Sequence, residues 1–416
     1  MKYGVNSNLE STENPIVDTI VNECVNKDIS IFLGAGASKA IGLPDMTSFW
    51  KQLYGNDFIA SLVNGSRYTL DSKANLPGQT IETNKKTLMR RLIQIVSMNK
   101  KKISLDLEDI FEHICKCPFC YFDQTSIDNI AKTFYIYSLC ASDNYNYKFP
   151  DVENNYKIYY EKITNWLDDL NSCISELRTS MKKFYFINKS HVEKIQTAIQ
   201  IYNPLLNFSH KKISIFTTNY DTIFEAINTS KHKKELDYRF VSGIKYNDNT
   251  QMHFFDLKNY LEVESNGQIP IYLFKLHGSI SWNREDEKTI VDCFPQNSAD
   301  KPDIIEPVIS KRPSEKEPFQ QLYAIFKGAL ETSKVMLFIG FSFRDDHIRD
   351  LVVQRLQRQD KPFYVICVAT KNNDYPDLNK HIEKLSANKN FIWIEKYFGE
   401  QETEKIILDN LKKLIL

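Results

Sequence analysis

Three polar side chains follow apolar runs, in positions where they could act on a sugar or a water molecule. Asn219 and Asp221 lie two residues apart in FTTNYDTIF, and such a pair can hydrogen-bond ribose hydroxyls, an ordered water or a neighbouring backbone group. His277, in FKLHGSISW, follows an apolar run and precedes Gly278 on a predicted tight turn. Because an imidazole titrates near neutral pH, His277 could serve as a general base. The alternatives are helix capping for Asn219 or Asp221 and a structural or solvent-facing role for His277.

A glycine-rich turn, GAGAS, follows a short apolar run near the start of the chain and contains Gly34, Ala35, Gly36 and Ser38. Glycine permits positive φ angles and a close approach to a phosphate, and the N-terminus of a following helix offers free amides. Lys39 stands where the dinucleotide fingerprint GxGxxG requires its third glycine. The turn therefore predicts either a phosphate-binding site or a tight strand-to-helix turn without a ligand.

A second small-residue turn, GFSFRDDHI, contains Gly340 and Ser342 and is followed by Asp345 and Asp346 in a predicted first helical turn. Acidic residues complement the helix dipole there. Together with His347, the two acids could suggest a metal-dependent nuclease. Adjacent helical residues point roughly 100° apart, so the pattern favours helix capping.

Apolar runs typical of buried strands precede each of these motifs. Three of them are followed by a small or polar turn and then a helical pattern: Ser30 to Leu33, Ile213 to Phe216, and Val335 to Ile339. Two further runs extend from Ile271 to Leu276 and from Phe363 to Ala369. Repeated strand, turn and helix units predict an α/β fold with a parallel sheet and helices on both faces. Ligands of such sheets bind beyond the carboxyl ends of the strands, where all four motifs are expected.

The rest of the chain is predicted to be mainly helical. Long amphipathic stretches rich in Leu, Ile, Lys and Tyr favour a large helical insertion over about residues 51–205. We expect residues 1–15 to form a polar N-terminal tail, residues 16–400 the sheet domain with its insertion, and residues 401–416 a closing helix. The insertion and the closing helix are the expected surfaces of a homo-oligomer.

Composition excludes several classes of protein. Lys plus Arg and Asp plus Glu both number 53, so no global basic field indicates direct binding of nucleic acid. The longest apolar runs are far shorter than a membrane span, and the polar N-terminus lacks a secretory signal, so we expect a cytoplasmic protein. The cluster HICKCPFC contains Cys115, Cys117 and Cys120, with His113 and the later Cys140 as further candidate zinc ligands. No second CxxC pair accompanies it, which favours free thiols over a structural zinc; we expect no metal.

Taken in order, GAGAS with GLPD, then TTNYD, LHGS and GFS resemble the sirtuin (silent-information-regulator) family over about residues 28–370. The resemblance implies a Rossmann-like sheet that binds NAD and chemistry that breaks the bond between nicotinamide and ribose. It also implies a set of residues that contact NAD through its phosphates, a following loop and the adenosine ribose: Gly34, Ala35, Gly36, Ser38, Pro44, Asp45, Gly340 and Ser342.

The same resemblance assigns the reacting end of the substrate. Thr218, Asn219 and Asp221 fall on the family's Gln-Asn-x-Asp stretch, in which the Asn and Asp flank the nicotinamide ribose. His277 falls on the catalytic histidine. The resemblance therefore implies Asn219, Asp221 and His277 as the catalytic residues.

Two departures from the deacylases of that family favour hydrolysis. Only Cys293 lies between His277 and Cys367, so the deacylases' zinc ribbon of two CxxC pairs is missing from the sequence. Met46 and Thr47 stand where the deacylases carry the Phe-Arg that shields the reacting ribose from water. A peptide substrate is therefore not expected.

TTNYD and GFSFRDDHI are similar to the bacterial defence-associated sirtuin-like branch, whose members hydrolyse NAD. The resemblance implies an NAD glycohydrolase, the effector of an antiphage abortive-infection system that depletes cellular NAD. It also implies a separate sensor, such as a HerA-type hexameric DNA-translocating ATPase, through which nucleic acid would act only indirectly. The alternatives are an NAD-dependent protein deacylase or ADP-ribosyltransferase, and a scaffold that senses NAD or ADP-ribose without turnover.

Overall fold

The computed structural model forms two compact units. It describes residues 14–45, 48–49, 179–208, 211–248, 251–263, 267–286, 290–294, 302–305, 316–358, 360–371 and 376–415. The larger unit comprises Met1–Leu43, Tyr185–Ile305 and Arg312–Leu416, and the smaller comprises Pro44–Phe184 and Glu306–Lys311. Both sheets and all of the labelled elements below belong to the larger unit.

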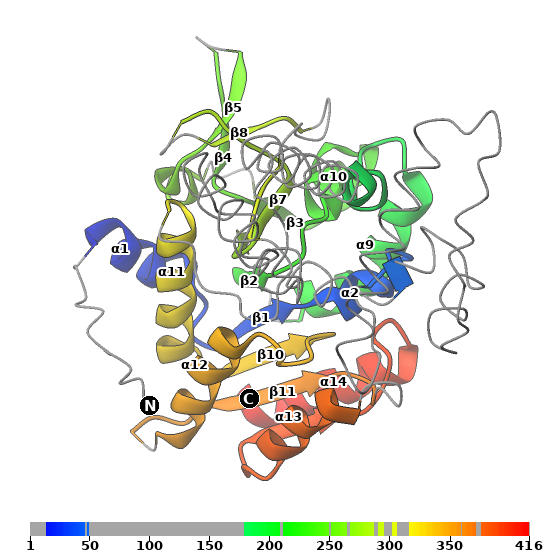
Figure 1. Cartoon of the computed structure of the whole chain (residues 1–416), viewed down its shortest axis with the longest axis vertical. Helices are drawn as coiled ribbons and strands as arrows, with labels where there is room; N and C mark the ends of the chain where they lie inside the picture. The colour runs from blue at the N-terminus through cyan, green and yellow to red at the C-terminus, as the bar shows by residue number, and fades with distance from the viewer. Residues whose placement is uncertain are drawn as a thin grey trace, which may run out of the picture. The chain divides into compact units, whose positions relative to one another are not determined.

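A seven-stranded parallel sheet forms the centre of the larger unit, with the strand order β12-β11-β10-β1-β2-β6-β3. Figure 1 shows its neighbouring strands β2, β1, β10 and β11 in this order. Its strands are β1 (Ile29–Leu33), β2 (Ile213–Thr217), β3 (Tyr238–Val241), β6 (Ile269–Lys275), β10 (Val335–Ile339), β11 (Tyr364–Val368) and β12 (Phe391–Ile394). Every neighbouring pair is parallel. All five residues of β1, β2 and β10 are buried, as expected for central strands covered on both faces.

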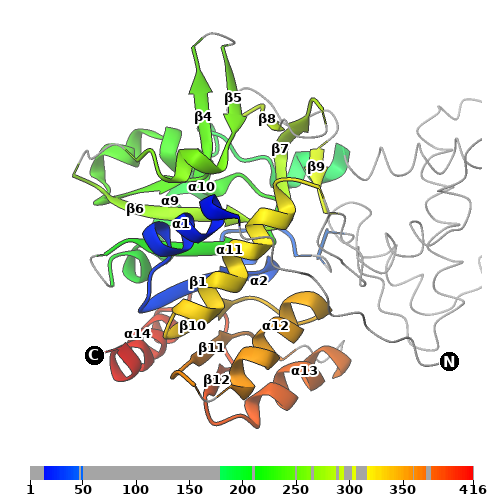
Figure 2. The ribbon, with the colours of Figure 1, turned by 90° about the vertical axis from the view of Figure 1, so that its left-hand side faces the viewer.

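Helices cover both faces of this sheet. One face packs against α1 (Pro15–Cys24), α11 (Phe319–Thr332), α12 (Asp346–Gln357) and α13 (Pro376–Ser386), and Figure 2 looks onto that side. The other packs against α2 (Ala35–Lys39), α9 (Val192–Leu206), α10 (Ile223–Thr229) and α14 (Gln401–Ile415). Strand β1 divides its side chains between the two cores: Phe32 enters the first, while Ile31 and Leu33 enter the second. The predicted α/β fold is confirmed.

A second, antiparallel sheet of five strands was not predicted. Its order is β4-β5-β8-β7-β9, with β4 (Ile244–Asn247), β5 (Met252–Phe255), β7 (Gly278–Arg284), β8 (Ile290–Asp292) and β9 (Pro302–Ile304). Two 3-10 helices, η2 (Lys231–Glu235) and η3 (Leu257–Tyr260), complete this region. The β4–β5 hairpin projects from the body of the unit (Figure 2). Because only two residues separate β6 from β7, the two sheets are joined through the Leu276-His277 turn.

The smaller unit contains most of the predicted helical insertion. Residues 179–184 are helical there, and the ring of Phe184 lies 5.5 Å from that of Phe49, centroid to centroid. The cysteine cluster with Cys115, Cys117 and Cys120 lies outside the described residues, as does Cys140. Within the described part of the chain, no helix is long and apolar enough to cross a membrane.

Candidate active site at the carboxyl edge of the parallel sheet

The predicted site residues of the larger unit lie on four connections that follow neighbouring strands. The GAGAS turn joins β1 to α2, TTNYD joins β2 to α10, His277 lies between β6 and β7, and GFSFRD joins β10 to α12. Because parallel strands end at one edge, the order β10-β1-β2-β6 places these four connections next to one another. The sheet therefore brings the four motifs together.

The turns after β1 and β10 are in direct backbone contact. The Gly36 amide donates to the Gly340 carbonyl oxygen at 2.9 Å, and the Gly34 amide donates to the carbonyl of Ile339 at 2.9 Å. Gly340 has a φ of +63°, and a Cβ built on it would lie 2.2 Å from the Ala37 nitrogen. A Cβ on Gly36 would lie 2.7 Å from the Gly340 Cα. These glycines are thus required by contact between the two turns, independently of any phosphate.

Gly340→Ala is expected to lower the free energy of unfolding by about 3 kcal/mol or more, because it combines a left-handed φ with a backbone clash. Gly42→Ala is the matched control, since Gly42 has a φ of +78° and a Cβ there would meet nothing within 4 Å. The control should lose only the conformational cost, about 1 to 2 kcal/mol. Urea denaturation measures both, and equal losses would contradict the proposed contact.

Asn219, Ser38 and Asp221 form a hydrogen-bonded cluster that joins the first two turns. Asn219 Nδ2 donates to the Gly34 carbonyl and to Ser38 Oγ, both at 2.8 Å. Ser38 Oγ in turn donates to Asp221 Oδ2 at 2.6 Å. Asn219 is half-buried, while Ser38 and Asp221 are buried. The predicted phosphate turn and the predicted ribose loop are therefore held as one unit by side chains that the motifs supply.

Asp221 also has a capping contact, because its Oδ1 accepts a hydrogen bond from the Ile223 amide at 3.3 Å at the start of α10. Its two carboxylate oxygens thus serve different partners. One oxygen contacts the first turn of α10, although Thr222 is the N-cap of that helix, and the other faces Ser38.

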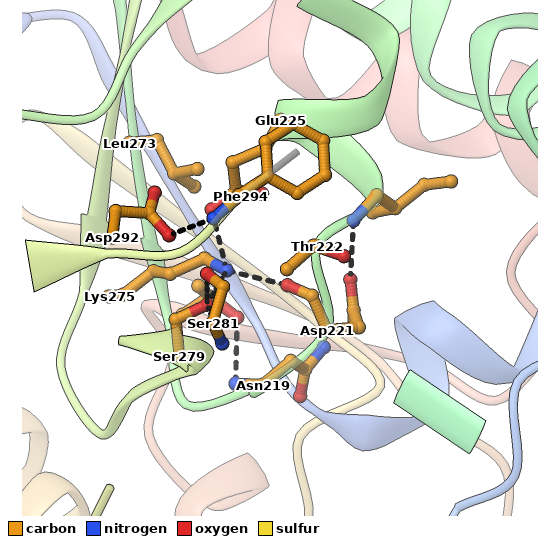
Figure 3. A network of polar contacts seen from close by, with 12 residues as sticks. Asn219, Asp221, Thr222, Glu225, Leu273, Lys275, Ser279, Ser281, Asp292 and Phe294 are labelled. Atoms are coloured by element: carbon orange, nitrogen blue, oxygen red, sulfur yellow. Dashed lines mark hydrogen bonds and ion pairs between the residues drawn. The ribbon is translucent and has the colours of Figure 1, made fainter. Parts of the chain in front are cut away.

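A buried lysine, Lys275, contacts this loop, and no sequence motif indicated a role for it. Figure 3 shows Lys275 directed toward Asp221, Glu225 and Ser279. Lys275 Nζ donates to the Asp221 carbonyl at 2.5 Å and to Ser279 Oγ at 3.1 Å, and it pairs with Glu225 Oε1 at 2.7 Å. All three ammonium hydrogens have an acceptor, which is what a buried ammonium group requires. The charge of Lys275 is therefore committed to holding the loop that carries Asn219.

Two buried carboxyl groups accompany that lysine. Burial raises the pKa of Glu225, and the nearby Lys275 opposes the shift. Burial likewise raises the pKa of Asp292. Hydrogen bonds from Ser281 and from the Phe294 amide act in the opposite direction and limit that shift. Ser281 also contacts Ser279 at 3.0 Å, so the network extends from α10 through β6 and β7 to β8 (Figure 3).

His277 is buried at the turn between β6 and β7, with an exposed fraction of 1%. Its carbonyl accepts from the Ile305 amide at 2.9 Å, and the Ile305 carbonyl accepts from Tyr220 Oη at 2.7 Å. His277 Nε2 lies 2.9 Å from Tyr323 Oη and 3.3 Å from Asp345 Oδ2. The histidine thus contacts side chains from α11 and from the start of α12.

Asp345 is the N-cap of α12, as favoured by the sequence, and its Oδ1 accepts from the amides of His347 and Ile348 at 3.1 and 3.2 Å. Asp346 is exposed and pairs with Arg349 at 2.6 Å. Across the described ranges, no group of three or more His, Cys, Asp and Glu side chains could hold a metal ion. Asp345 Oδ1 and Asp346 make the contacts of a helix start, and Asp345 Oδ2 faces His277, so these contacts give no support to the nuclease alternative.

The other residues predicted to contact a nucleotide lie in both units of the chain. Thr218, Ala35 and Ser342 are half-buried on the same edge of the sheet, and the Thr218 amide donates to the Leu33 carbonyl at 3.3 Å. Pro44 and Asp45 belong to the smaller unit, where Asp45 Oδ1 accepts from the Ser48 amide at 2.7 Å. Met46 and Thr47 lie outside the described residues. The roles of Pro44 and Asp45 toward a nucleotide remain predictions.

Fold and site together define an α/β protein with a polar site at the carboxyl edge of a parallel sheet, the type of site in which nucleotides bind. Residues 213–394 match the model of the SIR2-like domain family. No curated protein matches the chain. Residues 213–394 are therefore similar to a SIR2-like domain, and this similarity implies NAD-related activity and suggests an NAD-consuming enzyme.

The matched region includes the loops with Asn219, His277 and Ser342 but begins after the GAGAS turn. The sheet order explains how the GAGAS turn reaches the site. Strand β1, which precedes the turn, lies between β10 and β2, and both of these strands belong to the matched region. The chain thus supplies the central strand of the domain from a segment well before the match.

Proposed function

We propose that this chain is an NAD glycohydrolase, which cleaves NAD to nicotinamide and ADP-ribose. The observation that carries the proposal is the cluster of Asn219, Ser38 and Asp221. It joins a glycine turn to a polar loop at the carboxyl edge of the sheet, and the loop lies in the region that matches the SIR2-like domain model. NAD offers the matching chemistry, since its phosphates suit a turn without side chains and its ribose hydroxyls suit Asn and Asp.

In the proposed reaction the glycosidic bond between the nicotinamide nitrogen and the ribose C1′ breaks, and its electron pair leaves with nicotinamide. Asn219 would position the attacking water or the ribose, and Asp221 would support that loop through Ser38. A preorganised polar site stabilises the oxocarbenium-like transition state. Water forms the new bond to C1′, and His277 takes its proton. General-base assistance of this kind contributes roughly 10²- to 10⁴-fold.

Half-buried groups at the sheet edge are the proposed contacts to the rest of NAD. Ala35, Gly36 and Gly340 would lie against its phosphates and adenosine ribose, together with Ser342. Thr218 would lie beside the nicotinamide ribose. Pro44 and Asp45 would add contacts from the loop after α2. We propose no metal in this reaction.

The test is incubation of the purified full-length chain with NAD, with nicotinamide and ADP-ribose followed by liquid chromatography. We expect both products to accumulate in equal amounts. Calorimetric binding of NAD without any turnover, even with an activating partner present, would contradict the proposal and support a sensing scaffold.

We further propose that the enzyme is a cytoplasmic antiphage effector that depletes cellular NAD. A constitutive NAD hydrolase would be toxic to its own cell, so activity would await assembly into a homo-oligomer or a separate sensor such as a HerA-type ATPase. Cellular NAD should fall after phage infection in cells carrying the wild-type gene and remain stable with His277→Ala. Equal NAD levels in the two strains throughout infection would contradict this role.

A further inference from the structure

One nitrogen of the His277 imidazole, Nε2, lies close to both a carboxylate and a phenol. Its Nε2 lies 3.3 Å from Asp345 Oδ2 and 2.9 Å from Tyr323 Oη. The side chains of His277 and Asp345 are 1% and 2% exposed, so water screens this contact very little. None of the sequence motifs links the residues, which come from the turn between β6 and β7, from α11 and from the N-cap of α12.

Asp345 divides its two oxygens between two tasks. Oδ1 accepts two amides at the N-terminus of α12, and Oδ2 faces the histidine. Amides at a helix N-terminus favour the negatively charged form of an acid. An ionised carboxylate has no hydrogen to donate, so a nearby imidazole nitrogen is attracted to it when that nitrogen carries a hydrogen and is repelled when it presents a lone pair. The 3.3 Å contact therefore favours a hydrogen on His277 Nε2.

We propose that Asp345 is a positioning residue that fixes His277 as its Nε2–H tautomer, so that Nδ1 is the nitrogen that accepts the proton from water. The inference rests on the proposed NAD hydrolysis and deepens it. When Nδ1 takes the proton, the ring becomes an imidazolium whose positive charge faces the Asp345 carboxylate. The same division of labour operates in Asp-His pairs of hydrolases, where the acid orients the ring and stabilises its charged form.

Tyr323 fits this assignment because it adds no second charge. Burial and the neighbouring Asp345 raise the pKa of Tyr323 well above its usual value, so the phenol stays neutral. Its oxygen can share the Nε2 hydrogen with Asp345, and its ring lies 6.3 Å from that of His277. The ring of His347 also lies near Tyr323, 5.2 Å away from centroid to centroid, and burial lowers the pKa of His347 and so favours its neutral form. In the described part of the chain, the titratable groups with a known contact to the histidine or its phenol partner include Tyr220, Tyr323, Asp345 and His347.

Asp345→Asn separates the two tasks of Asp345. Asparagine is an equally good N-cap, so the bonds to the amides of His347 and Ile348 can persist while the charge facing His277 is lost. We expect kcat for nicotinamide release to fall by roughly 10²- to 10⁴-fold. We expect KM for NAD and the midpoint of thermal unfolding to change little.

Asp346→Asn is the matched control. It removes the same charge from the same helical turn, but Asp346 is exposed and pairs with Arg349. We expect this variant to keep kcat near that of the wild type. Wild-type kcat in Asp345→Asn, or an equal loss in both variants, would overturn the proposal.

Nuclear magnetic resonance of the full-length chain with isotope-labelled histidine tests the tautomer without NAD. The His277 signal is the one lost in His277→Gln. We expect the Nε2–H tautomer in the wild type and a mixture of tautomers in Asp345→Asn. An Nδ1–H tautomer in the wild type would overturn the inference whatever the enzyme does, whereas the expected tautomer without nicotinamide release would contradict only the proposed function.

Discussion

His277→Ala and Asn219→Ala are each expected to reduce nicotinamide release by at least about 100-fold. The first removes the proposed base. The second removes the amide that bonds Gly34 and Ser38 and that would position the water or the ribose. The measurement is the initial rate of nicotinamide release at saturating NAD, with circular dichroism and thermal unfolding to show that each variant is folded.

His253→Ala is the control for this pair. His253 lies on β5 of the antiparallel sheet, opposite Tyr246 on β4, and contributes to none of the four motifs. This variant should release nicotinamide at the wild-type rate. Wild-type rates in both His277→Ala and Asn219→Ala would contradict the assignment of the active site.

Lys275→Met is expected to lower the free energy of unfolding by about 3 to 5 kcal/mol at neutral pH, because it leaves Glu225 buried without its cation. The side chains of Lys275 and Glu225 are 1% and 8% exposed. The substitution also removes the hydrogen bond to the Asp221 carbonyl, in the loop that carries Asn219. Urea denaturation measures the loss, and the Lys275→Met, Glu225→Gln double variant should lose less than the sum of the two single variants.

The loss should depend on pH in a defined direction. Burial raises the pKa of Glu225 in the folded chain above its unfolded value, and Lys275 limits that shift. A raised carboxyl pKa means that the folded state binds more protons, so stability falls as the pH rises above the unfolded value. Without Lys275, burial raises the pKa of Glu225 in the folded chain further, so stability falls more steeply as the pH rises. Lys275→Met should therefore be less destabilising near pH 5 than near pH 8.

Lys211→Met provides the control for a surface ion pair. Lys211 pairs with Asp28 at 3.0 Å, but its side chain is 67% exposed. Exposed pairs contribute little, so this variant should unfold at nearly the wild-type urea concentration at either pH. An effect of Lys275→Met no larger than that of Lys211→Met would contradict a stabilising role for the buried pair.

The sequence predicted the parallel sheet because its central strands are continuous apolar runs. Strands β1, β2 and β10 are buried along their whole length, so composition alone marks them. The antiparallel sheet carries a weaker signal. Strand β4 is mostly exposed, and β8 and β9 have three residues each. In β7, Ser279 and Ser281 are buried as fully as Ile280, so burial does not follow the alternation of polar and apolar residues.

The residues of the candidate site that belong to short motifs were predicted from the sequence. Those that reach the site only through the packing of distant elements were not. Asn219, Asp221 and Ser38 are motif residues, and the structure bonds them to one another. Lys275 lies inside the apolar run that predicted β6, where a buried charge could have indicated a paired partner. Tyr323 has no motif of its own, since it reaches His277 only through the packing of α11.

Glycine also served a different purpose from the one its motif suggested. The GAGAS turn was interpreted through the close approach of a phosphate, whereas Gly36 and Gly340 are in backbone contact with each other. That contact depends on two segments about three hundred residues apart meeting at neighbouring strands. Local sequence cannot distinguish these two reasons for a glycine.

The product ratio tests the central claim most directly. Purified chain is incubated with NAD and a mixture of acylated lysine peptides, and nicotinamide, free ADP-ribose and O-acyl-ADP-ribose are quantified by mass spectrometry. Hydrolysis predicts one free ADP-ribose for each nicotinamide and unchanged peptides. Nicotinamide release matched by O-acyl-ADP-ribose or by ADP-ribosylated peptide, with no free ADP-ribose, would contradict it.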